Sequence, residues 1–473
     1  MNTPSLESYR SYRGLPPLAG IATLAEASKP GLGIESAVGR LKRFHYALIR
    51  LHQIFIARLT AEPIYELKTA FSHHAYLCAE HATALRTRVS EMREPPLGLE
   101  EIPHPGLHRF FEEILAAPST PELIAAIYGV ALPALEAAIQ AYQGDTNPLT
   151  DAPTCRVLRF VRLEVRDMLS FGQQAMQCLE ATAKPAHLDA YLTSAGGLDG
   201  TAATAEVPAP VWSTSPYVYD PVPRRDERFV DLWNQGVNAE AFLYDDRFDP
   251  RAKALMMLFK RLRELDVPEM MASILHQTKD KPWEYYREMT RQLWDEARHA
   301  MMGEVGFVAL GLDWTQARIT HNWSYRLNTE CTPLERHAVL FFIEQGLMTK
   351  TGKRYEWEVG AASGLELIKT IQDYDWADEV LHAQIGRRWY ITQFKDLREA
   401  LDYGDTCWSR ITSNWRTVRE QGWTQHENWW PVIYLQACQN WGIQPDAETL
   451  AYDVTYEDRR ADLRKNGART QSE

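Results

Sequence analysis

Two copies of one six-residue pattern carry the side chains that could do chemistry in this chain. Asp295–Ala300 reads D-E-A-R-H-A, and Asp378–Ala383 reads D-E-V-L-H-A. On a helix, residues three apart lie on one face about a turn apart, so the Glu and the His of each copy can point at the same atom. Carboxylate and imidazole groups spaced in this way indicate a metal pair held inside a helical bundle.

A bundle of this kind usually supplies two more Glu ligands, one from each of two further helices. Two ligands at the same height on adjacent antiparallel helices should flank a turn at the midpoint of their residue numbers, because both helices rise equally per residue. Glu344 meets this condition as the partner of Glu379. Their midpoint falls between residues 361 and 362, inside the turn-like segment Gly360–Gly364.

The partner of Glu296 is less sharply defined, and three candidates remain. Glu269 ranks first, because its midpoint falls at the Lys-Pro break before the next helix. Glu264 ranks second, with a midpoint at Asp280. Glu240 ranks third, because its partner helix would have to run through that Lys-Pro pair, and proline disrupts a helix interior.

In chain order, the ligand set resembles that of the ferritin-like di-iron carboxylate superfamily, which includes rubrerythrins, ribonucleotide reductase small subunits, bacterial multicomponent monooxygenases and arylamine N-oxygenases. The set is Glu269, Glu296, His299, Glu344, Glu379 and His382. The resemblance covers about Arg251 to Tyr390 and implies a ferritin-like four-helix bundle. It implies that Glu296 and Glu379 bridge or cap the metals, that each histidine binds one metal, and that the remaining two glutamates are terminal or bridging ligands.

This ligand set defines the cofactor that we expect. Carboxylate and imidazole ligands suit two metal ions, with iron favoured and manganese compatible. The resemblance implies O2 as co-substrate, and an oxygenase or oxidase that acts on a small organic molecule. The alternatives are a metal-handling or peroxide-scavenging protein of the ferritin or rubrerythrin type, and a helical scaffold with structural metals. A cavity that reaches the metals would favour the enzyme.

Several neighbours of the motifs have two readings. Asp295 and Asp378 lie four residues before each histidine, where they either orient the imidazoles or face solvent. Arg298 either neutralises a carboxylate-rich core or forms an ordinary salt bridge. Tyr374 and Trp376 either line a substrate site or pack between helices.

The rest of the chain must supply the helices that position these residues. Apolar residues recur at threes and fours over most of its length, and alternating strand patterns are few, so we predict an all-α fold with two helical bundles in tandem. Thr332-Pro333-Leu334-Glu335 is a capping box that should begin the helix of Glu344. The expected parts are an N-terminal arm (1–34), a helical domain (35–182), a linker (183–230), the metal-binding bundle (231–400) and a Trp-rich helical extension (401–473).

The domain 35–182 has the outline of a degenerate ferritin-like repeat. Glu80 and His81 occupy one predicted helix, and Glu136 and Glu164 flank a midpoint at Thr150, in a break between helices. The two Glu-x-x-His motifs are missing from this half. The alternative is an unrelated helical domain with acidic surface residues.

Composition limits the partners. The net charge of −12 disfavours nucleic acid, and we find neither a long apolar run typical of a membrane span nor a signal pattern at the N-terminus, so we expect a cytoplasmic protein without a membrane partner. Its 6 cysteines are scattered, which suits a reducing compartment. The expected partner is a small-molecule substrate, while an electron-donor protein and a homodimer are left open.

Overall fold

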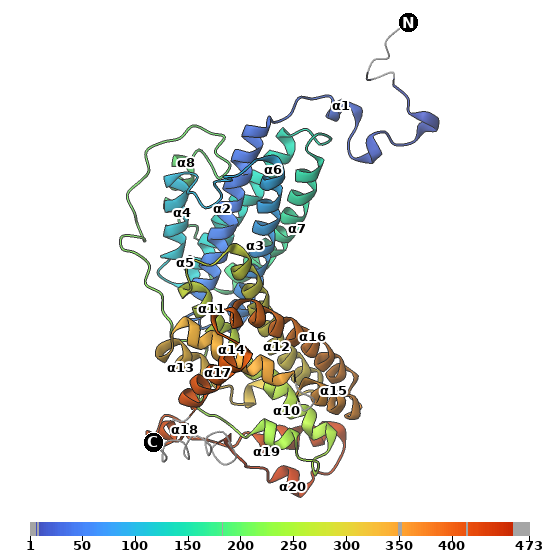
Figure 1. Ribbon diagram of the computed structural model, residues 1–473, viewed down its shortest axis with the longest axis vertical. Helices are drawn as coiled ribbons and strands as arrows, with labels where there is room; N and C mark the ends of the chain where they lie inside the picture. The colour runs from blue at the N-terminus through green and yellow to red at the C-terminus, as the bar shows by residue number, and fades with distance from the viewer. Residues whose placement is uncertain (1–5, 7–8, 182, 349–351, 413–414, 457–473) are drawn as a thin grey trace. The chain divides into compact units, whose positions relative to one another are not determined.

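The computed structural model describes residues 6, 9–181, 183–348, 352–412 and 415–456. Within these residues the chain is helical, with turns and loops between the helices (Figure 1). No β-strand occurs in the described part, where a single isolated bridge pairs Val237 with Thr455. The prediction of an all-α protein is confirmed. The ferritin-like topology and the tandem repeat stay predictions.

The chain divides into two compact units. Unit 1 comprises Met1–Phe55 and His74–Val218, and unit 2 comprises Ile56–His73 and Tyr219–Glu473. The segment 183–218, expected as a linker, is counted with unit 1 and contains a helix, α8 (His187–Ser194). The domain boundaries drawn from the sequence stay predictions.

Unit 1 is built around long helices. Its helices are α1 (Leu24–Ala27), α2 (Ile34–Leu59), α3 (Tyr65–Met92), α4 (Pro105–Leu115), α5 (Thr120–Ala126), α6 (Leu132–Asp145), α7 (Ala152–Cys178) and α8, with a π-helical turn at Ile127–Ala131. The facing ends of α2 and α3 pass into unit 2. Ser119 caps the start of α5 by accepting from the backbone N–H of Glu122.

One helical stretch in unit 1 is long and apolar enough to cross a bilayer. It runs from Thr120 to Asp145, and an 18-residue window of it has a mean hydropathy of 1.6. Within the protein, 72% of that window is buried. Burial inside the protein therefore explains the apolar composition of this stretch, as in the core helix of a folded domain.

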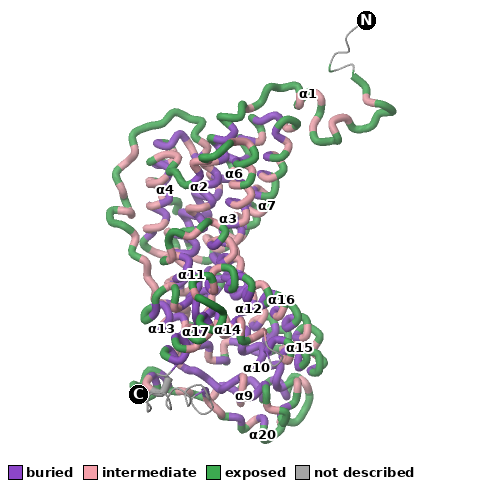
Figure 2. The backbone as a smooth tube through the Cα atoms, viewed as in Figure 1, coloured by how far each residue is buried: buried purple, intermediate pink, exposed green. Residues whose placement is uncertain are grey.

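Unit 2 contains the helices that carry the two motifs. They are α9 (Ala239–Leu243), α10 (Pro250–Arg263), α11 (Asp266–Gln277), α12 (Trp283–Ala309), α13 (Asn322–Glu330), α14 (Pro333–Leu347), α15 (Lys353–Ala362), α16 (Glu366–Trp389), α17 (Leu397–Thr412), α18 (Trp415–Glu420), α19 (Trp430–Trp441) and α20 (Ala447–Leu450). The predicted capping box at Thr332 is present at the start of α14. Helix α10 is buried along most of its length (Figure 2).

The helices around the motifs contact one another in a ring. Helices α10 and α11 pack on α12, α12 packs on α16, and α16 packs on α14 and α15. The ring closes because α10 also contacts α15 and α11 contacts α14. Two sides of the ring are thus each made of two successive helices, so four helical walls surround one interior.

A glycine allows α10 and α12 to approach closely. A Cβ on Gly303 would lie 2.6 Å from the backbone nitrogen of Leu262 and 2.7 Å from the carbonyl oxygen of Leu258. These are backbone atoms and cannot move aside as a flexible side chain can. Gly303 is one turn beyond His299, so this close approach sets the distance between α10 and the first motif.

The Trp-rich end of the chain completes the core of unit 2. Trp429 and Trp430 are almost fully buried in the cluster that also contains Phe242 and Phe259. Trp429 contacts the Phe259 ring with centroids 4.3 Å apart, and Trp430 contacts Phe242 at 5.0 Å. These tryptophans pack against α9 and α10.

Candidate metal centre

Two groups of carboxylates and imidazoles lie next to each other inside unit 2. The His299 group consists of Glu264, His299, Asp375 and Glu379, and the His382 group consists of Glu296, Glu344, Glu379 and His382. Within each group, one nitrogen or oxygen atom from every residue lies within 4.8 Å of the others. Glu379 belongs to both groups, so the two candidate metal positions are adjacent.

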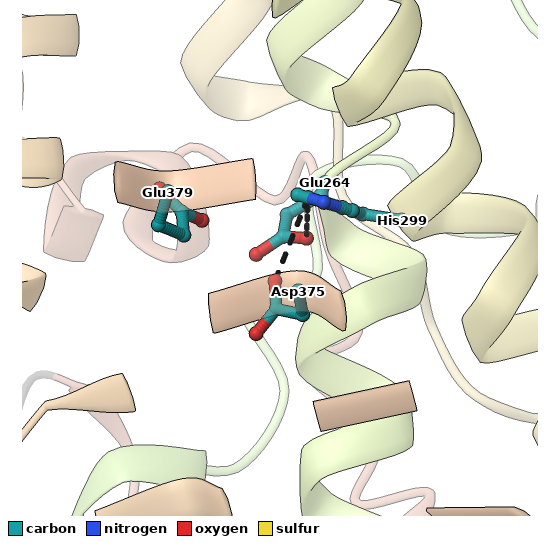
Figure 3. A group of neighbouring side chains, drawn as sticks. All are labelled: Glu264, His299, Asp375 and Glu379. Atoms are coloured by element: carbon teal, nitrogen blue, oxygen red, sulfur yellow. Dashed lines mark ion pairs between the residues drawn. The ribbon is translucent and has the colours of Figure 1, made fainter. Parts of the chain in front are cut away.

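Each wall of the helical ring contributes to the groups. Glu264 comes from the C-terminal end of α10, Glu296 and His299 from α12, Glu344 from α14, and Asp375, Glu379 and His382 from α16. Figure 3 shows the His299 group, in which the side chains from α10, α12 and α16 converge. The spacings of three and four residues on α12 and α16 place their ligands on one face.

The aspartate of each motif bonds to the histidine of the other. His299 Nε2 lies 3.2 Å from Asp378 Oδ2, and His382 Nε2 lies 3.4 Å from Asp295 Oδ2. An ionised carboxylate only accepts, so each Nε2 carries the hydrogen. This arrangement leaves the Nδ1 lone pairs for another partner, and it resolves the two readings of Asp295 and Asp378 in favour of orienting the imidazoles.

Both Nδ1 atoms face carboxylates. His299 Nδ1 lies 3.3 Å from Glu264 Oε2 and 3.6 Å from Asp375 Oδ1, contacts that are drawn in Figure 3. His382 Nδ1 lies 3.2 Å from Glu296 Oε1 and 3.5 Å from Glu379 Oε2. A cation placed between these atoms could bind imidazole nitrogen and carboxylate oxygen together.

The pKa values show that these positions attract positive charge. Burial alone would lower the pKa of His299, but its contacts with the carboxylates of Asp378, Glu264 and Glu296 outweigh burial and raise this pKa to about 10. Burial and the charges of Glu379 and Glu296 raise the pKa of Glu344 well above its ordinary range. A site that holds protons in this way could exchange them for a metal ion, since metal ligands bind in their deprotonated forms.

The donor atoms themselves test whether a metal pair fits. Six buried atoms of the two groups have no hydrogen-bond partner among the described residues: Glu264 Oε2, Glu296 Oε1, His299 Nδ1, Glu344 Oε2, Glu379 Oε2 and His382 Nδ1. Leaving buried polar atoms unpaired costs free energy, and each of these atoms is a metal ligand type. The residues therefore fit two ions that prefer oxygen and imidazole ligands.

Two basic side chains lie beside the groups. Lys353 Nζ lies 2.9 Å from both carboxylate oxygens of Asp375 and 2.8 Å from Glu379 Oε1. Arg261 lies 2.8 Å from Glu264 and also contacts Asp375. Both side chains are at most 1% exposed. The excess of carboxylates is thus partly neutralised by the chain itself.

A cavity of about 430 Å³ reaches the carboxylates. Four candidate ligands line it: Glu264, Glu296, Glu344 and Glu379. Its apolar wall is formed by Val267, Met270, Leu327, Val339, Leu340, Ile343, Leu347, Trp323 and Trp408. Its uncharged polar residues are Gln235, Asn238, Thr320, Tyr244 and Tyr456, and further charged side chains also line it: Glu240, Lys260, Arg261, Arg263 and Asp266. This volume lies within the range of pockets that enclose small organic ligands.

Glu269 lies outside both groups and has other partners. Its carboxylate is fully buried between Lys68 Nζ at 2.9 Å and the Arg225 guanidinium at 3.0 Å, and it accepts from Ser324 Oγ at 2.8 Å. The structure places Glu264, the second-ranked candidate, next to His299 instead. The loop between α11 and α12 is centred on residue 280, and this is the midpoint that Glu264 predicts.

The other residues singled out in the sequence have ordinary surroundings. Arg298 bonds to Asp378 at 2.7 Å and also contacts Asp295, so it holds the two aspartates together. Tyr374 is 63% exposed, and neither it nor Trp376 lines the cavity described above. Asp375 escaped sequence reasoning, although it lies one turn before Glu379 on the same face, a spacing that could have revealed it.

Acidic residues and histidines in unit 1 form pairs. His81 Nε2 lies 2.7 Å from Glu164, and Glu136 is held by Arg162 at 2.7 Å and Arg166 at 3.0 Å. Both groups of metal-ligand type found in the described residues lie in unit 2. Whether unit 1 is a degenerate copy stays a prediction.

No family model, no curated protein and no solved structure matches this chain. The class that the structure defines is therefore an all-helical protein with two buried carboxylate and histidine groups that could hold metal ions. The functional argument rests on their geometry.

Proposed function

We propose that unit 2 is a ferritin-like four-helix bundle that holds two metal ions, iron in the first place, and that the protein is an O2-dependent oxidoreductase acting on a small organic molecule. The observation that carries the proposal is the cavity, because it is lined by four carboxylates of the two groups and by a wall of apolar side chains. A storage protein or a scaffold has no need of such a space beside its metals.

The candidate ligands and their neighbours would have distinct roles in holding the metal ions. His299 and His382 would bind through Nδ1, and Asp378 and Asp295 fix the two rings by accepting from Nε2. Glu379 would bridge the two positions, since it belongs to both groups. When bound, a pair of irons would supply the reduction of O2 that drives oxidation of the substrate.

The cavity would hold and orient the substrate. Its apolar wall on α11, α13 and α14 would exclude water and pack against a hydrocarbon part, and polar side chains such as Asn238 and Tyr456 would receive a polar end. We therefore expect a substrate that is amphipathic and small enough for about 430 Å³.

Metal analysis tests the core of the proposal. Protein saturated with ferrous iron under anaerobic conditions should retain about two metals per chain, as in other carboxylate-bridged bundles. His299→Ala and His382→Ala should lose most of this metal while keeping the helical circular dichroism of the wild type. Protein that binds no metal when supplied with iron and manganese would remove the central claim.

Oxygen uptake separates an enzyme from its alternatives. The reduced, iron-loaded protein should consume O2, and candidate amphipathic compounds should accelerate this uptake and be oxidised. Ile343→Trp, which fills the cavity, should keep the metal and lose the acceleration. Iron that accumulates far beyond two ions per chain would instead favour a metal-handling protein, and stable metals without any O2 uptake would favour a scaffold.

A further inference from the structure

The two groups differ in how their charges are balanced. In the His299 group, every carboxylate already contacts a Lys or Arg: Asp375 and Glu379 contact Lys353, and Glu264 contacts Arg261. In the His382 group, neither Glu296 nor Glu344 forms an ion pair with a Lys or Arg of the described residues. Glu296 contacts His299 and His382, and Glu344 contacts His382 and Gln292.

The unpaired donor atoms follow the same division. Each of the four residues of the His382 group has one buried atom without a hydrogen-bond partner in the described part of the chain: Glu296 Oε1, Glu344 Oε2, Glu379 Oε2 and His382 Nδ1. Glu379 is shared, so three of these atoms belong to the His382 group alone, and two, Glu264 Oε2 and His299 Nδ1, belong to the His299 group alone. Every residue of the His382 group thus has an unpaired donor atom, whereas Asp375 of the His299 group has none.

The Lys353 ammonium lies where a cation would bind. Its Nζ is 2.9 Å from two oxygens of Asp375, 2.8 Å from Glu379 Oε1 and 4.0 Å from Glu264 Oε1, so it contacts three of the four residues of the His299 group. Two positive charges so close together in a buried site would repel strongly. A metal in the His299 group therefore has to displace this ammonium from the carboxylates or share them with it.

We infer that Lys353 makes the two metal positions unequal: the His382 group binds its ion first and tightly, and the His299 group binds a second ion only when the Lys353 side chain leaves Asp375 and Glu379. This inference rests on the proposed metal centre and adds the order of loading. Lys353 is the first residue of α15, so its side chain can withdraw by a change at the start of that helix.

The order of loading determines how the buried charges are balanced when only one metal ion is bound. With one ion in the His382 group and Lys353 in the other group, Glu379 still has a cation on each side. The buried carboxylates then keep counter-charges before the second ion arrives, which avoids an unpaired buried charge. The Lys353 ammonium thus supplies the positive charge beside Asp375 and Glu379 until the second metal ion binds.

Anaerobic titration with Co(II), followed by its absorption bands and by equilibrium dialysis, tests this inference. The wild type should bind one ion tightly and a second with an affinity at least about tenfold lower. Lys353→Met should raise the affinity for the second ion by at least about tenfold. The matched control is Lys253→Met, which removes another buried lysine that bonds to Tyr355 on α15 at 3.0 Å and should leave both steps unchanged.

Two variants assign the steps to the groups, and they also serve if Lys353→Met does not fold. Glu344 belongs to the His382 group alone, so Glu344→Gln should lose the tight step. Asp375 belongs to the His299 group alone, so Asp375→Asn should change the weak step and leave the tight one.

The outcomes separate the inference from the proposed function. Two equal steps in the wild type, or loss of the tight step in Asp375→Asn with its retention in Glu344→Gln, would overturn the role of Lys353 while keeping the metal centre. Absence of any Co(II) binding by the wild type would overturn the metal centre itself.

Discussion

Asp295 Oδ2 accepts a hydrogen bond from His382 Nε2 at 3.4 Å, although the two residues belong to different copies of the D-E-x-x-H-A motif. Asp378 and His299 repeat the arrangement in the opposite direction at 3.2 Å. Each copy therefore supplies a candidate ligand to one group and the support for the ligand of the other. The repeat is a reciprocal unit, and α12 and α16 must dock correctly for either histidine to be oriented.

Substitution of these aspartates should weaken metal binding without removing a ligand. Asp295→Asn and Asp378→Asn leave the imidazoles without a charged acceptor, and loss of such outer partners typically costs 10- to 100-fold in metal affinity, so we expect a decrease of about this size. Competition with a chromophoric chelator measures it. The control is Asp373→Asn, an exposed aspartate of α16, the helix that carries Asp378. Equal affinities in all three variants would contradict a supporting role.

Glu269→Gln should affect stability and leave the metal content intact. The substitution removes the negative charge between Lys68 and Arg225, and stranding a buried partner of an ion pair costs about 3 to 5 kcal/mol. Urea unfolding measures this loss, and metal analysis is done on the same sample. The control is Glu66→Gln, whose partner Arg228 is partly exposed, where at most about 1 kcal/mol is expected. Metal loss in Glu269→Gln at unchanged stability would identify Glu269 as a ligand, as the sequence predicts.

Gly303→Ala should push α10 and α12 apart. The added Cβ would meet backbone atoms of Leu262 and Leu258 at 2.6 and 2.7 Å, and overpacking of this kind costs about 1 to 3 kcal/mol. Because Glu264 ends α10 and His299 is on α12, metal affinity should fall as well.

Gly346→Ala provides the control for this substitution, since no heavy atom of the described residues outside its own helical backbone lies within 4 Å of the added Cβ. Alanine is favoured over glycine in a helix, so this variant should be unchanged or more stable by up to about 1 kcal/mol. If both variants unfold at the same urea concentration, the close approach does not limit the packing of these helices.

The stability of the protein should fall below pH 6.5 in part because of His337. Burial, and then the charge of Lys281, lower the pKa of His337 from 6.5 to about 3. The unfolded chain binds this proton below pH 6.5 and the folded protein does not, so the stabilising contribution is complete above pH 6.5 and is lost as the pH falls towards 3.

For this histidine alone, we expect a loss of about 2 kcal/mol between pH 8 and pH 5. His337→Phe removes the titrating group and keeps an aromatic ring next to Tyr285 and Tyr390, so its unfolding free energy should fall less steeply over this range. Urea unfolding at pH 8, 6.5 and 5 compares the two slopes. If the unfolding free energy of the two proteins depends on pH equally, the pKa of His337 is not lowered in the folded protein.

The sequence was most informative where local spacing alone decides the geometry. The helical period places Glu296 with His299 and Glu379 with His382, and the structure has all four on α12 and α16 with their donor atoms close together. The midpoint argument also selected Glu344, and the structure has this residue in the His382 group. The connection between α15 and α16 spans residues 363–365, which overlaps the predicted turn segment Gly360–Gly364.

The sequence was less informative where a helix start had to be located to within a turn. Glu269 and Glu264 differ by five residues, and their predicted midpoints differ by less than three. The prediction placed the break between the helices at Pro282, next to the start of α12, whereas the loop runs from residue 278 to 282. A shift of two or three residues along a helix turns a side chain to another face. The sequence ranking therefore favoured Glu269, whose side chain points to Lys68 and Arg225.

Lys353 could not have been predicted from any local pattern. Its neighbours in the sequence give no sign of burial, and it reaches Asp375 only because α15 packs on α16. A lysine is rarely buried unless it is paired, so its position is a product of tertiary packing. The same reasoning applies to Arg261, whose partners come from three different helices and the end of its own.

The assignment of Ile56–His73 to unit 2 limits how this protein can be divided. A fragment that begins at Tyr219 would contain every candidate ligand, yet Glu269 would lack Lys68 inside an otherwise closed interior. A gene fusion that carries only the chain from Tyr219 onward would meet the same obstacle. Unit 2, which contains both candidate metal groups of the described residues, therefore depends on a segment from the first part of the chain to keep Glu269 paired.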